Sequence, residues 1–205
     1  MLTKGSKITA GIFAISIFLF GFSMLQNVAY YIDPASKLYL AGSSNVVDFT
    51  CNCTQGFPDN EVYFQEDAAK KKWIFKGAEL KIQSRKLDCG NKGMNRDMYN
   101  TLKADKYPTI TIELLETTQP HDKSFMEGNH WVGMDAKVAI TIAGVRKIHN
   151  LAVESKKLSN TKFEFKSCQT LYMTDFGIEP PKPFMGMIKV KDEILIHMDL
   201  IIKKK

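Results

Sequence analysis

The residues of this chain best suited to chemistry are its four cysteines, Cys51, Cys53, Cys89 and Cys168. Cys51 and Cys53 are two positions apart, so on a strand both thiols project from the same face. A taut strand holds them about 7 Å apart, the upper edge of disulfide range, so their mutual bond is the least favoured pairing. An even cysteine count in an oxidising compartment favours disulfides. We expect two long-range bridges, with the connectivity left open.

The Cys51-x-Cys53 pair also suits a different chemistry. Thiolates prefer soft metal ions such as Cu(I), and one of the ten methionines could add a thioether ligand. A thiol-based metal or redox protein that uses Cys51 and Cys53 is therefore the alternative to a disulfide role.

Other catalytic and metal-binding patterns are missing from the sequence. The histidines His121, His130, His149 and His197 have none of the close spacings of zinc ligands. The Asp-Phe-Gly triplet at 175–177 matches a kinase metal-binding motif, but the glycine-rich loop and catalytic loop that phosphoryl transfer requires are absent. No nucleophile elbow or phosphate-binding loop occurs. We expect no enzyme, no catalytic residue and no cofactor.

The amino terminus has the pattern of a secretory leader. Lys4 and Lys7 precede an uncharged, mostly apolar run at 8–25, the order of a signal peptide's charged and apolar regions. We expect cleavage after Ala29, which divides the chain into a signal peptide at 1–29 and one domain at 30–205. Because 18 uncharged residues lie near the lower limit for spanning a bilayer, an uncleaved anchor is the alternative. The protein is expected to be exported, and the membrane to be contacted only through an uncleaved leader.

The charge pattern argues against a nucleic-acid partner. Beyond residue 29, 26 bases face 22 acids, since the leader holds two lysines and no acid. The signs are interspersed, as at 189–193, so no strong steering field is expected. The basic tail at 203–205 is interpreted as a solvated end, because stable membrane attachment needs more charge or a second anchor.

Short apolar segments broken by Gly, Pro, Asn and Asp predict a mostly β chain after the leader. Ile110, Ile112 and Leu114 alternate with polar residues, which places one face of that strand in a core. The eight expected strands are 37–40, 46–53, 73–82, 109–115, 132–142, 151–156, 162–171 and 188–202. Helical spacing of Met94 and Met98 predicts one short helix at 94–105. The polar stretch 117–129 is expected to be a long connection.

Three stretches in one order resemble the YceI-like family: LDCGNKGMNRDMYNTLKADKYPTITIEL at 87–114, VAITIAGVRKIHNLAV at 138–153, and MTDFGI at 173–178. The resemblance covers most of the chain after the leader. It implies an all-β fold with one short helix, an eight-stranded antiparallel lipocalin-like β-barrel. It also implies a periplasmic protein of a Gram-negative bacterium that holds a polyisoprenoid, and no catalytic residues.

An eight-stranded barrel is just wide enough to be filled by side chains or to hold one slender ligand. Each buried methylene contributes about 0.8 kcal/mol, so an isoprenoid-type lipid or a quinone would need few polar contacts. Alternation leaves open whether the inner face is hollow or an ordinary core. The expected lining is Phe49, Trp73, Phe75, Ile110, Ile112, Leu114, Val138, Ile140, Ile142, Phe163, Phe165, Phe176, Phe184, Ile196 and Met198.

A proline-rich loop at 179–187 precedes the last expected strand and contains Phe184 and Met185. Its composition and position suggest an apolar lid over the barrel mouth. The expected partner is a long-chain apolar lipid; a homodimer is left open. An enzyme acting on a lipid or quinone has no support beyond the expected cavity.

Overall fold

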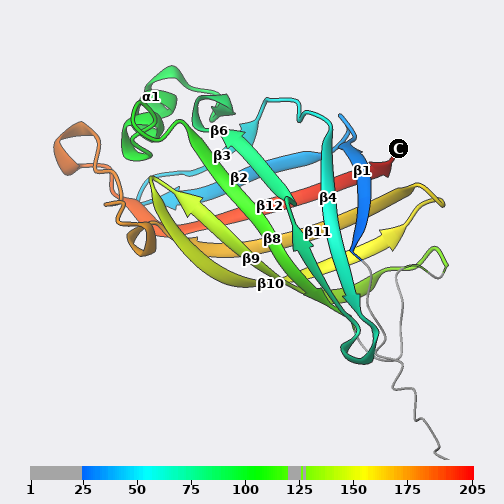
Figure 1. Ribbon diagram of the computed structural model, residues 1–205. Coiled ribbons are helices and arrows are strands. Elements are labelled where there is room, and N and C mark those ends of the chain that lie inside the picture. The colour runs from blue at the N-terminus through cyan, green and yellow to red at the C-terminus, as the bar shows by residue number, and fades with distance from the viewer. Residues whose placement is uncertain (1–24, 120–125, 127) are drawn as a thin grey trace, which may run out of the picture.

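The computed structural model describes residues 25–119, 126 and 128–205 (Figure 1). Outside them lie His121, most of the connection at 117–129, and the apolar run of the expected leader except Leu25. The elements are β1 Gln26–Ile32, β2 Lys37–Ser44, β3 Asp48–Cys53, β4 Asn60–Asp67, β5 Lys72–Lys76, β6 Glu79–Gln83, β7 Leu87–Asp88, α1 Lys92–Thr101, β8 Thr109–Thr118, β9 Val132–Ile142, β10 Val145–Lys157, β11 Lys162–Tyr172 and β12 Val190–Lys204. Four 3₁₀ turns complete them: η1 Ala68–Lys70, η2 Ser84–Lys86, η3 Met173–Phe176 and η4 Phe184–Gly186. Among the described residues, no helix is both long and apolar enough to cross a bilayer.

Eight antiparallel strands close into a ring in the order β1-β4-β5-β8-β9-β10-β11-β12. The closing pair joins β12 back to β1, with Tyr30 opposite Lys204 and Ile32 opposite Ile202. Figure 1 shows these strands wrapped around a common interior, with α1 across one end. The chain is therefore mostly β with one helix, as the sequence predicts.

The remaining strands extend the wall at the end that carries α1. From β12 the sheet continues through β2, β3 and β7, and β6 pairs with β8. The side chain of Gln55 crosses the gap between β3 and β6: its Nε2 donates to the Lys81 carbonyl and its Oε1 accepts from the Gln83 N–H, both at 2.7 Å. The Gln55 amide thus supplies hydrogen bonds to the backbone of β6 where β3 and β6 do not pair directly.

The strand count corrects the sequence prediction of eight, because the described residues form twelve. The expected strand 73–82 is split into β5 and β6 at Gly77, whose φ of 76° suits glycine. Strand β4 is too polar to stand out, and β1 begins inside the stretch assigned to the leader. The expected strand 46–53 begins only at Asp48, since residues 44–47 form a turn.

Helix α1 begins two residues before its predicted start and ends four before its predicted end. Asn91 caps it, because the side-chain oxygen accepts from the N–H groups of Gly93 at 2.8 Å and Met94 at 3.1 Å. Lys103 has a φ of 52°, so the chain has left the helical conformation by that residue.

The predicted alternation is confirmed in the core. Every even-numbered residue of β9 from Val132 to Ile142 is buried, and Ile110 and Ile112 of β8 are buried with them. On β12, Ile196 and Met198 pack against the same core, while His197 lies on the outer face. These faces give the ring an apolar interior.

Candidate functional site

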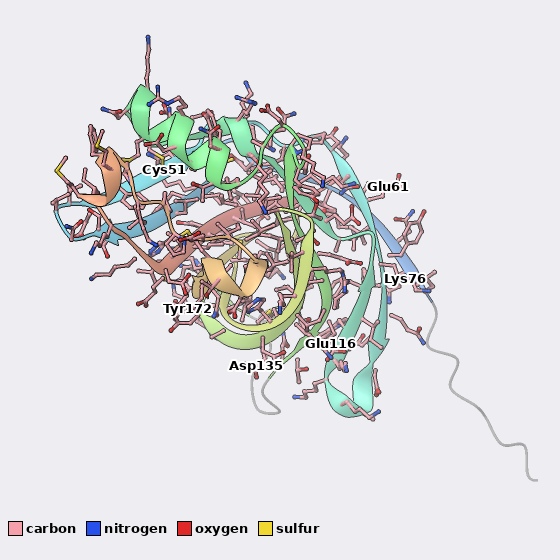
Figure 2. The ribbon with its side chains drawn as sticks, turned by 90° about the vertical axis from the view of Figure 1, so that its left-hand side faces the viewer. Cys51, Glu61, Lys76, Glu116, Asp135 and Tyr172 are labelled. Carbon is pink, nitrogen blue, oxygen red and sulfur yellow. A yellow bond between two sulfur atoms is a disulfide. The ribbon has the colours of Figure 1, made fainter. Side chains whose placement is uncertain are left out.

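An apolar cavity opens at the end of the ring that carries α1. Its volume is about 380 Å³, near the lower end of the 300–1,000 Å³ typical of small-molecule sites. Its walls come from α1, from β2, β3, β8 and β12, and from the loop between β11 and β12. Figure 2 faces this end: α1 lies above strands that curve round beneath it.

Seven of the fifteen expected lining residues lie in the wall of this cavity: Phe49, Ile110, Ile112, Ile142, Phe176, Phe184 and Ile196. Four others belong to the packed interior: Val138 and Ile140 are buried in the core, and Leu114 and Met198 pack against it. The last four are half-buried and lie outside the cavity wall: Trp73 and Phe75 on β5, and Phe163 and Phe165 near the start of β11. Ligand contact by any of them stays a prediction.

Sequence reasoning missed the contribution of α1 to the wall. Met94, Met98 and Leu102 line the cavity from above. Their helical spacing predicted an apolar helix face, but it could not say what that face covers. Leu38 and Leu40 of β2 were also missed, because a short strand between turns gives little pattern to read.

A glycine makes room for one wall residue. Gly42 faces inward on β2, opposite Phe49 of β3. A Cβ at Gly42 would lie 2.5 Å from Phe49 Cζ and 2.8 Å from Ile194 Cδ1, closer than packed carbon atoms approach. The missing side chain therefore leaves room for the Phe49 ring in the cavity wall.

The 173–178 segment closes the interior beneath the cavity. Phe176 is only 1% exposed and stacks against His149, with ring centroids 6.0 Å apart. Thr174 holds the turn in place, because its N–H and hydroxyl both donate to Asp192, at 2.9 and 2.5 Å. Gly177 ends the turn at a φ of 66°. In the Asp-Phe-Gly triplet, Phe176 therefore fills the interior and Gly177 ends the turn, which is a structural role.

The polar residues of the cavity wall gather mainly on the side of α1. Asn91, Arg96, Asp97 and Thr101 lie there, and Arg96 Nε is 3.7 Å from Asp97 Oδ1. The opposite walls are almost wholly aliphatic and aromatic. Such a site can hold an apolar chain and place one polar group beside α1.

One disulfide forms, between Cys51 and Cys89. Cys51 is buried on β3, and Cys89 precedes the cap of α1, so the bond ties the helix to the sheet at the cavity wall. Cys51 and α1 lie together in Figure 2. The expectation of a second bridge is wrong, since Cys53 and Cys168 carry free thiols.

Strand parity explains why those two thiols stay apart. Cys53 shares the inner face of β3 with Cys51, whereas Cys168 pairs with His197 and lies exposed on the outside. The Cys51–Cys89 bond also removes one thiolate from the expected Cys-x-Cys metal ligand pair. Burial raises the pKa of the Cys53 thiol, which makes it a poor thiolate ligand. Across the part of the chain described, no three His, Cys, Asp or Glu side chains gather in a group that could hold a metal ion.

A family model of the YceI-like domain matches residues 30–202. The chain belongs to this family. Among curated proteins none matches the sequence.

Several solved structures have a similar fold. A polyisoprenoid-binding domain from Saccharophagus degradans implicated in plant cell wall breakdown is 13% identical, with a TM-score of 0.64 over 87% of this chain and 99% of that one. BcnA of Burkholderia cenocepacia is 18% identical, with a TM-score of 0.59 over 83% and 98%. The YCEI protein of Campylobacter jejuni is 15% identical, with a TM-score of 0.50 over 80% and 84%. At these identities the likeness shows the fold.

The YceI-like stretches at 87–114 and 138–153 pair as neighbouring strands β8 and β9, and they also meet where Tyr107 contacts Gly144. Tyr107, just before β8, packs its ring over Gly144 in the β9–β10 turn, where a Cβ would lie 2.5 Å from Tyr107 Cε1. Gly144 has a φ of 82°, which also favours glycine. In this YceI-like chain, the contact joins the segment between α1 and β8 to the β9–β10 turn.

Proposed function

We propose that this YceI-like protein is an exported binding protein that holds a polyisoprenoid or similar long apolar chain in the cavity beneath α1. The observation that carries the proposal is the cavity itself, which is open at one end and walled by aliphatic and aromatic side chains of α1 and the sheet. The printed description of one structural neighbour as a polyisoprenoid-binding domain supports the ligand class.

Energetics favour a chain of this kind. Each methylene transferred from water into such a cavity contributes about 0.8 kcal/mol, so a segment of a few isoprene units binds without a polar anchor. A cavity of about 380 Å³ accepts part of a long chain, so the rest must extend beyond it. A quinone ring or another polar end would lie beside Asn91 and Arg96 of the α1 wall.

Export is part of the proposal. The leader-like residues at the amino terminus and the Cys51–Cys89 disulfide both fit an oxidising compartment such as the periplasm.

Two adjacent residues of β12 test the cavity. Ile196 lines it, whereas Leu195 lies on the outer face and is 36% exposed. Ile196→Trp should fill the cavity and strongly reduce the apolar lipid that mass spectrometry detects in gently purified protein. Leu195→Trp should retain the wild-type amount, and circular dichroism checks that both variants fold. Wild-type protein that carries no extractable apolar molecule, or equal lipid in both variants, would refute the proposal.

A further inference from the structure

Bulky apolar side chains point into solvent around the opening of the cavity. They come from the turn between β2 and β3 and from the loop between β11 and β12, which lie at the same end as α1 (Figure 1). We call them the mouth surface: Val46, Val47, Phe184, Met185 and Met187, with exposed fractions of 62%, 54%, 68%, 105% and 71%. Exposed apolar patches of this kind mark interaction sites.

The β2–β3 turn is held in a fixed conformation. Ser44 Oγ accepts from the N–H groups of Val46 at 3.2 Å and Val47 at 3.0 Å, and it lies 3.0 Å from the Val47 carbonyl oxygen. Ser44 N–H donates to the same carbonyl at 2.9 Å. Both valines are therefore presented outward by a hydrogen-bonded turn.

Asn45 joins this turn to the neighbouring loop. Its side chain donates to the Met187 carbonyl at 3.0 Å and accepts from the Lys189 N–H at 2.7 Å, and its own N–H donates to the Lys189 carbonyl at 3.1 Å. The two apolar segments are thus parts of one surface.

The backbone of the loop keeps its apolar side chains outward. Phe184 and Met185 both have a φ of 54°, followed by Gly186 at 85°. The left-handed region is costly for bulky L-residues, and strain of this kind gathers at functional sites. The loop therefore tolerates strain while leaving Met185 wholly exposed.

Several lysines lie in and beside the mouth surface. The segment 181–191 holds Lys182, Lys189 and Lys191 and no acid, although Asp192 and Glu193 follow it directly. Arg96 of α1 lies in the cavity wall across the opening. Acidic neighbours offset two of them, since Lys182 pairs with Glu179 at 2.9 Å and Arg96 lies near Asp97. Lys189 and Lys191 form no ion pair with any residue that the structure describes.

We propose that the mouth surface docks on an anionic lipid bilayer, with its apolar side chains in the interface and the lysines against lipid phosphates. Apolar residues flanked by Lys and Arg are the combination that binds such interfaces. Val47 and Phe184 also line the cavity. If the cavity holds a lipid, as proposed above, docking would let the chain pass between membrane and protein without crossing water.

Vesicle cosedimentation tests the apolar part. Met185 and Val46 belong to the mouth surface but not to the cavity wall. Wild-type protein should bind vesicles of phosphatidylcholine mixed with phosphatidylglycerol, and the double variant Val46→Asp, Met185→Asp should lose at least about tenfold in affinity. Leu158→Asp is the matched control. Leu158 is 37% exposed and lies at the β10–β11 turn, which is near the last residues of β12 and therefore far from the mouth surface at its first residues. It should bind as wild type.

Charge is tested on the same vesicles. Lys189→Gln with Lys191→Gln should weaken binding several-fold and reduce its salt dependence. Lys70→Gln with Lys204→Gln, at the opposite end, should not. Binding to phosphatidylcholine alone should be weak.

The outcomes separate docking from lipid carriage. Wild-type protein that carries lipid yet ignores anionic vesicles would overturn docking and leave the proposed function standing. Wild-type protein that binds anionic vesicles but carries no lipid would support docking and overturn the proposed function. Docking would also be overturned if Leu158→Asp lost as much vesicle affinity as the mouth variants. Unchanged vesicle binding by the mouth variants would overturn it too, and would leave a protein as the partner of this surface.

Discussion

Single residues of this chain act mainly by the space they leave or fill. Gly42 leaves room for Phe49 in the cavity wall, and Gly144 leaves room for Tyr107 at the junction of two family motifs. Phe176 fills the interior below the cavity. None of them needs a reactive group, which is why their importance is invisible to a search for catalytic motifs.

Gly144→Ala should lower the free energy of unfolding by about 2–3 kcal/mol, because it adds a Cβ clash with Tyr107 to an unfavourable positive φ. Urea unfolding measures the change. Gly133→Ala is the matched control: Gly133 lies on β9, its φ is ordinary, and no atom lies within 4 Å of the added Cβ. A Gly144 variant as stable as the Gly133 variant would contradict this account of the motif.

At the scale of elements, α1 is a wall of the cavity that is fastened at its start. The disulfide joins its cap region to β3, and the Cys89 N–H donates to Asn95 Oδ1 at 2.8 Å. The loop before β12 is held separately, through Asn45. Phe184 of that loop borders the cavity but is 68% exposed. The loop therefore lies beside the opening, and its closure as a lid stays a prediction.

Removing the disulfide should loosen this wall. The bond closes 38 residues of sequence, so Cys89→Ala should cost about 3–4 kcal/mol of unfolding free energy by the chain-entropy estimate. It should also reduce copurified lipid. Cys168→Ala, at an exposed free thiol on the outer face, should change neither quantity. Denaturant unfolding and lipid mass spectrometry provide the two measurements, and stability that Cys89→Ala leaves unaltered would show that α1 is held by packing alone.

At the scale of the whole molecule, the two ends of the ring differ. The mouth surface and α1 occupy one end, while β1 begins toward the other, where Gln26 pairs with Phe64 of β4. A leader kept as an anchor would then attach to the end away from the cavity opening. Cleavage would free the mouth surface to meet a membrane, which makes the position of the cut important for the proposed docking.

The expected cut after Ala29 would remove four of the five residue pairs that join β1 to β4. Amino-terminal sequencing of the exported protein locates the cut. Cleavage after Ala29 should leave the chain beginning at Tyr30, with β1 shortened and β4 losing most of its pairing on that side. A mature chain that still contains Gln26 would contradict that site, and a chain that retains residues 1–24 would establish the anchor instead.

Much of the fold follows from local patterns in the sequence. Alternation along β8, β9 and β12 identified their buried faces, because a strand places neighbours on opposite sides whatever its partners are. The helical spacing of Met94 and Met98 located α1. The order of three motif stretches indicated the family.

Tertiary structure alone decided the site, because it depends on which faces meet. The sequence showed apolar side chains but not that α1 would lie over them and leave about 380 Å³ between. It showed four cysteines, whereas strand parity and the position of α1 selected Cys51 with Cys89 and left Cys168 outside. Local periodicity records the direction of each side chain, while cavities and disulfides require distances between segments far apart in the chain, and only packing sets those distances.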